Sequence, residues 1–150
     1  MRYPYKLWPL KRPHPAFPDE RHSWIPILNV RIAAAARPSQ TTNLFEAVVD
    51  SGSADTLFHA DIAQQIGIAV DSGIAAHRFG GVVEGQGMTV YFHDVHLHVG
   101  SDIIKIRAGF SDRLSTAALL GRRGFFEHFI VTFDSAPTPP EMEIQRLARV

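Results

Sequence analysis

Most of this chain consists of short apolar segments, and in several of them apolar residues alternate with polar ones. Alternation with a period of two predicts β-strands that bury one face. The expected strands cover residues 24–36, 45–49, 68–70, 74–79, 88–99, 103–110, 117–120 and 129–134. Many short strands separated by turn residues predict an all-β protein with a closed or nearly closed barrel.

Helical patterns are short and few. Residues 60–66 predict a helix because Asp61 suits its first turn and Gly67 ends it. Residues 122–127 predict a second small helix. We also expect a terminal helix over 141–150, where acidic residues come first and arginines last, as the helix dipole favours.

The length of 150 residues indicates one domain with two appended ends. We expect a proline-rich arm over 1–23, the barrel over 24–134, and a proline linker with the terminal helix over 135–150. Prolines as dense as those of the arm are expected to prevent helix and regular ladder pairing. Two interpretations of the arm stay open: it packs over the barrel or a partner subunit, or it docks onto another protein.

Charge and composition exclude several classes of protein. Fifteen basic residues balance fifteen acidic ones, which gives no electrostatic case for binding nucleic acid or an anionic membrane. The absence of cysteine removes disulfides, thiol catalysis and cysteine-metal sites. No run has the length of a transmembrane helix, and the N-terminus lacks the apolar segment of a secretory signal. The expected compartment is therefore the cytoplasm.

The most informative motif is Phe-Glu-Ala-Val-Val-Asp-Ser-Gly-Ser-Ala-Asp-Thr-Leu-Phe, at residues 45–58. An apolar strand delivers Asp50 into a turn made of Ser51 and Gly52. A carboxylate costs several kcal/mol to bury as an isolated ion, so it needs hydrogen-bond donors or a partner with which to share a proton. Ser51 and the backbone amides around Gly52 are the expected donors.

At these residues the chain resembles the retropepsin-like aspartic proteases. Their signature is a hydrophobic strand, then Asp-Thr/Ser-Gly, then small and polar residues ending in a hydrophobe, which residues 50–57 match. A second element of the family, two hydrophobes and Gly-Arg, is matched by residues 119–122. The resemblance covers residues 24–134. It implies a retropepsin-like closed β-barrel with one or two short helices, which acts as an aspartic endopeptidase on peptides or proteins without a cofactor or metal.

The resemblance also assigns roles to individual residues. Asp50 is the implied catalytic residue, and Ser51 would hydrogen-bond across a dimer axis while Gly52 lets the substrate backbone come close. The implied supporting residues are Ser53, Asp55 and Thr56 in the catalytic loop, and Leu120, Gly121 and Arg122 behind it.

Aspartic protease chemistry needs two carboxylates that share one proton. Only one suitable Asp-Ser-Gly occurs in the chain, so the second carboxylate must come from a second copy, and a symmetric homodimer is expected. The other Asp-Ser-Gly, at 71–73, lacks the continuation of the motif, and we interpret Asp71 as a turn residue. An alternative of another class is a catalytically inactive dimer that binds extended peptides in the same cleft.

The segment 79–87 is rich in glycine and lies where retropepsin-like enzymes carry a flap that closes over substrate. Gly80, Gly81, Val82 and Gly85 are the candidate flap residues. The alternative is a plain bulged hairpin, because glycines within strands usually mark bulges.

The chain departs from the family pattern beside the catalytic loop. The family arginine matched by Arg122 pairs with an acid, but the usual position of that acid holds Ala54. Asp55 or Asp61 could serve as the partner instead. Arg123 stands where Asn or Asp is common. The family joins its subunits through both termini, and the proline-rich ends of this chain make that mode doubtful.

A third hypothesis is a metal site on the strand 88–99. Asp94, His96 and His98 point to one side of a strand, with His93 nearby, and neutral imidazole suits zinc. The favoured interpretation is a solvated strand face, because these residues alternate with valine and leucine. No metal site is therefore predicted.

Overall fold

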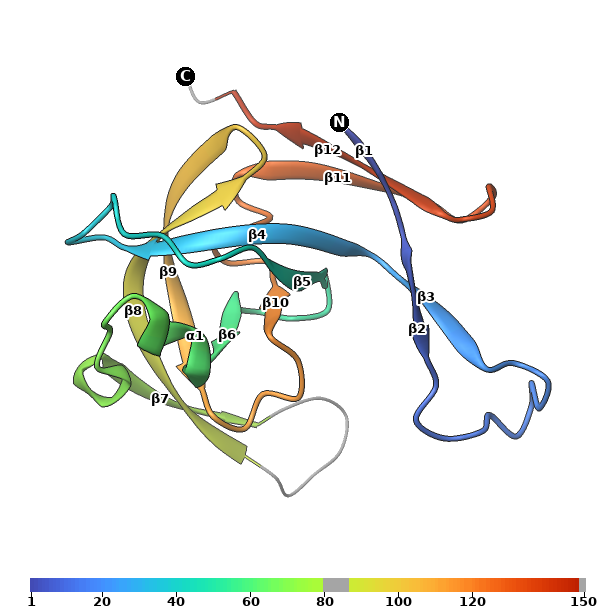
Figure 1. The fold of residues 1–150 in the computed structure, drawn as a ribbon, viewed down its shortest axis with the longest axis horizontal. Helices are drawn as coiled ribbons and strands as arrows, with labels where there is room; N and C mark the ends of the chain where they lie inside the picture. The colour runs from blue at the N-terminus through green and yellow to red at the C-terminus, as the bar shows by residue number, and fades with distance from the viewer. Residues whose placement is uncertain (80–86, 149–150) are drawn as a thin grey trace.

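A computed structural model describes residues 1–79 and 87–148 of the chain (Figure 1). The strands are β1 (Arg2–Pro4), β2 (Lys6–Pro9), β3 (His22–Ile25), β4 (Ile27–Ala34), β5 (Phe45–Val49), β6 (Leu57–His59), β7 (Ile74–Phe79), β8 (Gly87–Val99), β9 (Asp102–Ser111), β10 (Ala118–Leu120), β11 (Phe129–Asp134) and β12 (Glu141–Arg146). Helix α1 spans Ala60–Gln65, and a single 3-10 turn spans Val70–Ser72.

Six strands close into a barrel, as the sequence predicts. Their order is β4-β5-β10-β6-β9-β8, and pairing of β8 with β4 closes the ring. Strand β7 extends β8 as an antiparallel hairpin outside the ring. Closure removes the free edges that an open sheet would expose.

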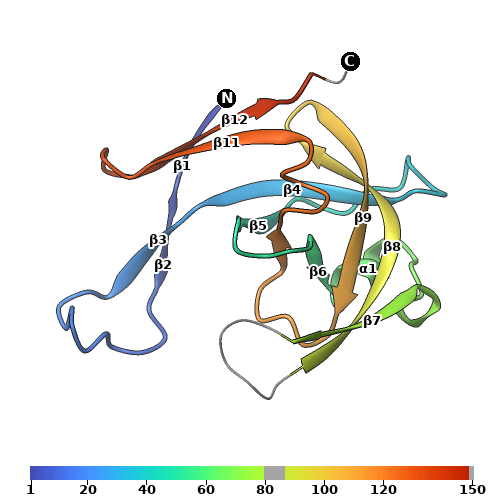
Figure 2. The ribbon, with the colours of Figure 1, turned by 180° about the vertical axis from the view of Figure 1, so that it is seen from behind.

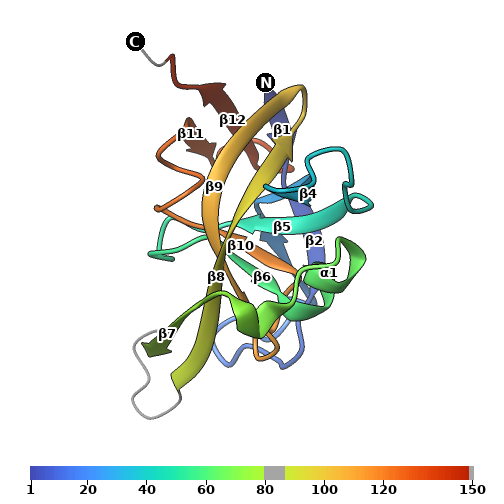
Figure 3. The ribbon, with the colours of Figure 1, turned by 90° about the vertical axis from the view of Figure 1, so that its left-hand side faces the viewer.

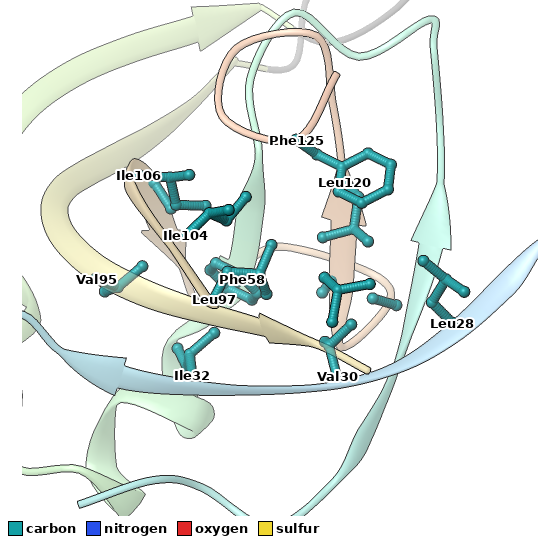
Figure 4. Packing of buried hydrophobic residues seen from close by; sticks show 14 of the residues in the cluster. Leu28, Val30, Ile32, Phe58, Val95, Leu97, Ile104, Ile106, Leu120 and Phe125 are labelled. Atoms are coloured by element: carbon teal, nitrogen blue, oxygen red, sulfur yellow. The ribbon is translucent and has the colours of Figure 1, made fainter. Parts of the chain in front are cut away.

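Aliphatic and aromatic side chains from all six strands fill the barrel (Figure 4). Val30 and Ile32 of β4 lie opposite Val99 and Leu97 of β8, and all four are buried. Phe58 packs at the centre, its ring 5.6 Å from that of Phe110. Burial of this set supplies the main stabilisation of the fold.

The two chain ends form a second sheet beside the barrel, with strand order β1-β12-β11. Figures 2 and 3 show this sheet against the end of the barrel where β8 turns into β9. Met142 and Ile144 of β12 belong to the same core as the barrel strands, and Tyr3 and Tyr5 of the arm pack against it. Strands β2 and β3 pair separately as a two-stranded hairpin.

The predicted terminal helix over 141–150 is wrong, because residues 141–146 form β12. Met142 and Ile144 are buried while Glu143 and Gln145 are exposed, which is a period of two. Six residues of β11 pair with β12 and satisfy its backbone groups. A ten-residue helix would be marginal without such partners.

Two other local predictions are corrected. Residues 122–127 form successive turns and no helix, because Gly124 takes a φ of +93°, outside the helical region. Residues 68–70 do not form a strand. The Ser72 hydroxyl donates to the carbonyl of Ala69 at 2.6 Å and stabilises the 3-10 turn there. The helix predicted over 60–66 is confirmed as α1.

The prolines of the arm do not prevent ladder pairing, contrary to expectation. Pro4 ends β1 and Pro9 ends β2, and both strands lie at sheet edges, where a missing N–H costs no ladder bond. The strand expected over 24–36 is split at Pro26 into β3 and β4. In the part of the chain that is described, no helix is long and apolar enough to cross a bilayer.

We predict that Met142→Ala lowers the free energy of unfolding by about 2–5 kcal/mol, because it opens a cavity in a fully buried site. Glu143→Ala on the same strand should change it by less than about 0.5 kcal/mol, since its ion pair with Arg2 is largely exposed. Urea denaturation of both variants measures the difference. Equal effects would contradict the assignment of β12 to the core.

Candidate functional site

Asp50 lies where β5 leaves the barrel. Strand β10 lies parallel to β5, with Leu119 opposite Val48 and Leu120 opposite Val49, and antiparallel to β6. The loop from β5 to β6 therefore crosses the end of β10, the strand between them. This crossing holds the Asp50 loop against residues that follow β10.

The backbone of Asp50 extends the β5–β10 ladder by one bond, from its N–H to the carbonyl of Leu120 at 2.9 Å. Val49 faces the core, so alternation places the next side chain on the outer face. The half-buried carboxylate accepts a hydrogen bond on Oδ1 from the Gly52 N–H at 2.9 Å. A backbone amide, as the sequence predicts, therefore donates to Asp50.

Thr56 and Gly121 hold the Asp50 loop against the residues that follow β10. The fully buried hydroxyl of Thr56 donates to the carbonyl of Arg123 at 2.8 Å and accepts from the N–H of Gly121 at 3.1 Å. A Cβ on Gly121 would lie 2.1 Å from the carbonyl oxygen of Asp55, so any side chain there would collide with backbone. The crossing is compact enough to require glycine at this position.

Asp55 pairs with Arg123, not with Arg122. The carboxylate of Asp55 is buried and accepts from Arg123 Nε at 2.7 Å. Asp61 is exposed and lies 3.5 Å from His59, so it is not the acid that Arg122 was expected to pair with either. The prediction missed Arg123, although its departure from the family pattern was a signal.

Arg122 instead braces the loop through its backbone carbonyls. Its guanidinium donates to the carbonyl of Ser51 at 2.8 Å, and its N–H donates to the carbonyl of Ser53 at 2.9 Å. The Ser53 hydroxyl donates to the carbonyl of Asp55 at 2.7 Å. The structure thus brings residues 119–123 against residues 50–56, the two segments that carry the motifs.

The structure does not place every candidate residue. Gly80, Gly81, Val82 and Gly85, the candidate flap residues, lie outside the described residues. Asp71 is exposed in the 3-10 turn, consistent with a turn residue.

Two hollows of about 680 and 480 Å³ lie on the surface. The larger lies beside α1 and the start of β8, and the smaller is lined by Asp55, Arg107 and Arg123 among others. Neither has Asp50 in its lining.

The histidine face of β8 shows no metal site. Asp94 accepts from Arg107 Nε at 2.9 Å, and this hydrogen bond lowers the pKa of Asp94. His96 and His98 are half-buried, so they are less exposed than the predicted solvated strand face. His96 Nδ1 and His98 Nε2 have no hydrogen-bond partner among the described residues. Those residues contain no group of three ligands placed to hold a metal.

We predict that Gly121→Ala lowers the free energy of unfolding by about 1–3 kcal/mol or more, because the new methyl group would overlap the backbone of the crossing loop. Gly52→Ala is the matched control. Its Cβ would meet only the Asp50 carboxylate, at 3.1 Å, and should cost less. Thermal and urea unfolding compare the two; a larger loss for Gly52→Ala would contradict the packing described.

Burial, with His96 and Arg31 nearby, lowers the pKa of His98 below its ordinary value of 6.5. The unfolded chain therefore binds a proton that the folded chain does not. Stability should fall as the pH drops from neutral through 6.5, and level off below the folded pKa. His98→Gln should reduce this slope, as measured by urea unfolding across that range. An unchanged slope would contradict the assignment.

No protein-family model and no curated protein matches the chain. Among solved structures, it is similar to the EIAV protease complexed with the inhibitor HBY-793, with 16% sequence identity and a TM-score of 0.46. The match covers 65% of this chain and 82% of that one. Because one fold can host many activities, the function rests on the site itself.

Proposed function

We propose that this chain is a retropepsin-like aspartic endopeptidase that works as a symmetric homodimer, with one Asp50 from each subunit on the two-fold axis. The observation that carries the proposal is the position of Asp50. Its carboxylate is half-buried in the loop that follows β5, and the crossing over β10 fixes that loop. A reacting group needs such a rigid support and an accessible face.

The chemistry of Asp50 supports a two-chain site. A single carboxylate cannot both activate a water and protonate the product. A second copy related by a two-fold axis would bring an identical carboxylate to the first and close the other side. Two carboxylates at such a short separation share one proton, because they cannot both ionise.

In the proposed reaction the two carboxylates take different roles. The ionised Asp50 accepts a proton from water as the water oxygen attacks the peptide carbonyl, and the protonated Asp50 donates to the developing oxyanion. The Gly52 N–H, which bonds one carboxylate oxygen, would hold that carboxylate in orientation. The Asp50 that took the proton from water then donates it to the amide nitrogen, while the other Asp50 takes a proton from a hydroxyl of the tetrahedral species. The C–N bond breaks, which releases the amine and the carboxylic acid without a covalent enzyme intermediate.

We predict that Asp50→Asn abolishes cleavage of a peptide library while the fold and the oligomeric state persist, because an amide cannot share the proton. Asp71→Asn is the control, since it changes the other Asp-Ser-Gly, and should retain full cleavage. Residual cleavage by Asp50→Asn equal to that of Asp71→Asn would contradict the proposal. Binding of peptides by the unaltered protein without any cleavage would favour the inactive peptide-binding dimer.

A further inference from the structure

We propose that the β2–β3 hairpin is a clasp that packs onto the second subunit and holds the dimer together. The clasp comprises β2, β3 and the loop 10–21 between them. The inference rests on the proposed function, because it takes the partner to be a second copy of this chain that approaches Asp50.

The clasp leaves the barrel next to Asp50. Strands β4 and β5 pair up to Ile27 opposite Val48, and the N–H of Val49 then donates to the carbonyl of Pro26 at 2.9 Å. The residue after Val49 begins the Asp50 loop, and the residue before Pro26 ends β3. Figures 1 and 2 show the hairpin projecting from the barrel on that side. A copy that brings its own Asp50 to the axis must therefore approach beside the clasp.

Apolar side chains on the clasp are left without cover in the single chain. Leu7 and Trp24 are cross-strand partners on one face of the hairpin, and they are 48% and 39% exposed. Phe17 in the loop is 57% exposed. An exposed tryptophan next to leucine is the kind of anchor that dominates protein interfaces.

The side-chain bonds that join the clasp to its own barrel lie at the end of the hairpin nearest the barrel. Lys6 Nζ bonds the carboxylate of Glu46 at 2.7 Å and the side-chain oxygen of Asn29 at 3.1 Å. Further out, the bonds run within the clasp, such as that from Leu10 N–H to the carbonyl of Arg21. A two-stranded hairpin is marginally stable alone in water, so a surface that covers it should stabilise it.

The chain ends give a second reason for assigning this role to the clasp. Strand β1 pairs with β12 of the same chain, and the Met1 ammonium donates to the carbonyl of Ile144 at 2.9 Å. The terminal strands are therefore already paired inside one subunit. We assign the dimer contacts to the clasp, because it extends from the Asp50 side.

The test compares Leu7→Glu, alone and with Trp24→Glu, with the matched control Ile103→Glu. Ile103 has a side chain of the same composition as Leu7 and is 60% exposed on β9. Sedimentation velocity over a concentration series gives the dimer dissociation constant, and circular dichroism verifies folding. We expect the double variant to raise that constant more than about tenfold and the control to change it less than about twofold.

A second measurement does not depend on a disruptive variant. The chain has no cysteine, so Leu7→Cys can carry a single photo-crosslinking group. In a mixture of isotopically light and heavy chains, we expect mixed-isotope crosslinks between the clasp and the partner barrel. Crosslinks within one chain only, or a dimer that withstands Leu7→Glu with Trp24→Glu, would overturn the inference.

The same data separate this inference from the proposed function. An active dimer that withstands the clasp variants would refute the clasp and leave the protease intact. A dimer that the clasp variants dissociate, but that cleaves no peptide, would support the clasp and refute the protease. A protein that stays monomeric at every concentration would overturn both.

Discussion

The crossing of the Asp50 loop over the end of β10 is the constraint on which the rest of the site depends. The buried Thr56 hydroxyl joins both sides of the crossing, and Gly121 allows the two backbones to touch. A buried hydroxyl that both donates and accepts leaves no unsatisfied group in the interior. Since β10 lies between β5 and β6, its removal would open the barrel and release the loop together.

The same crossing holds the Asp50 loop on its inner side. The Arg122 guanidinium and N–H donate to the backbone carbonyls of Ser51 and Ser53, and Asp55 forms an ion pair with Arg123. The half-buried Asp50 carboxylate therefore belongs to a loop that is fixed at several points. A reacting group requires such rigid support.

The sequence predicts the barrel well because its signals are local. Short apolar runs mark the strands 74–79 and 129–134 with the bounds that the structure has, and the short helix is recognisable from Asp61 and Gly67. The sequence-based prediction fails where pairing with another strand determines the local structure. Residues 141–146 pair with β11 although their charges suit a helix, and the arm forms edge strands despite its prolines. Pairing between distant segments outweighs local propensity in such places.

The site was predictable in part. The motifs at 50–57 and 119–122 identify the two segments that the structure brings together, because each resembles one part of a known pattern. The pairing of Asp55 with Arg123 was missed because the resemblance offered Arg122 for that role, although the departure of Arg123 from the family pattern was a signal.

The central claim is that two copies of Asp50 form one catalytic site, and subunit mixing tests it most directly. Unaltered and Asp50→Asn chains are unfolded together, refolded at varied ratios and assayed for peptide cleavage. If both carboxylates are needed, activity follows the square of the unaltered fraction, about a quarter at equal mixing. Activity in direct proportion to that fraction would mean that each chain works alone, and would contradict the account.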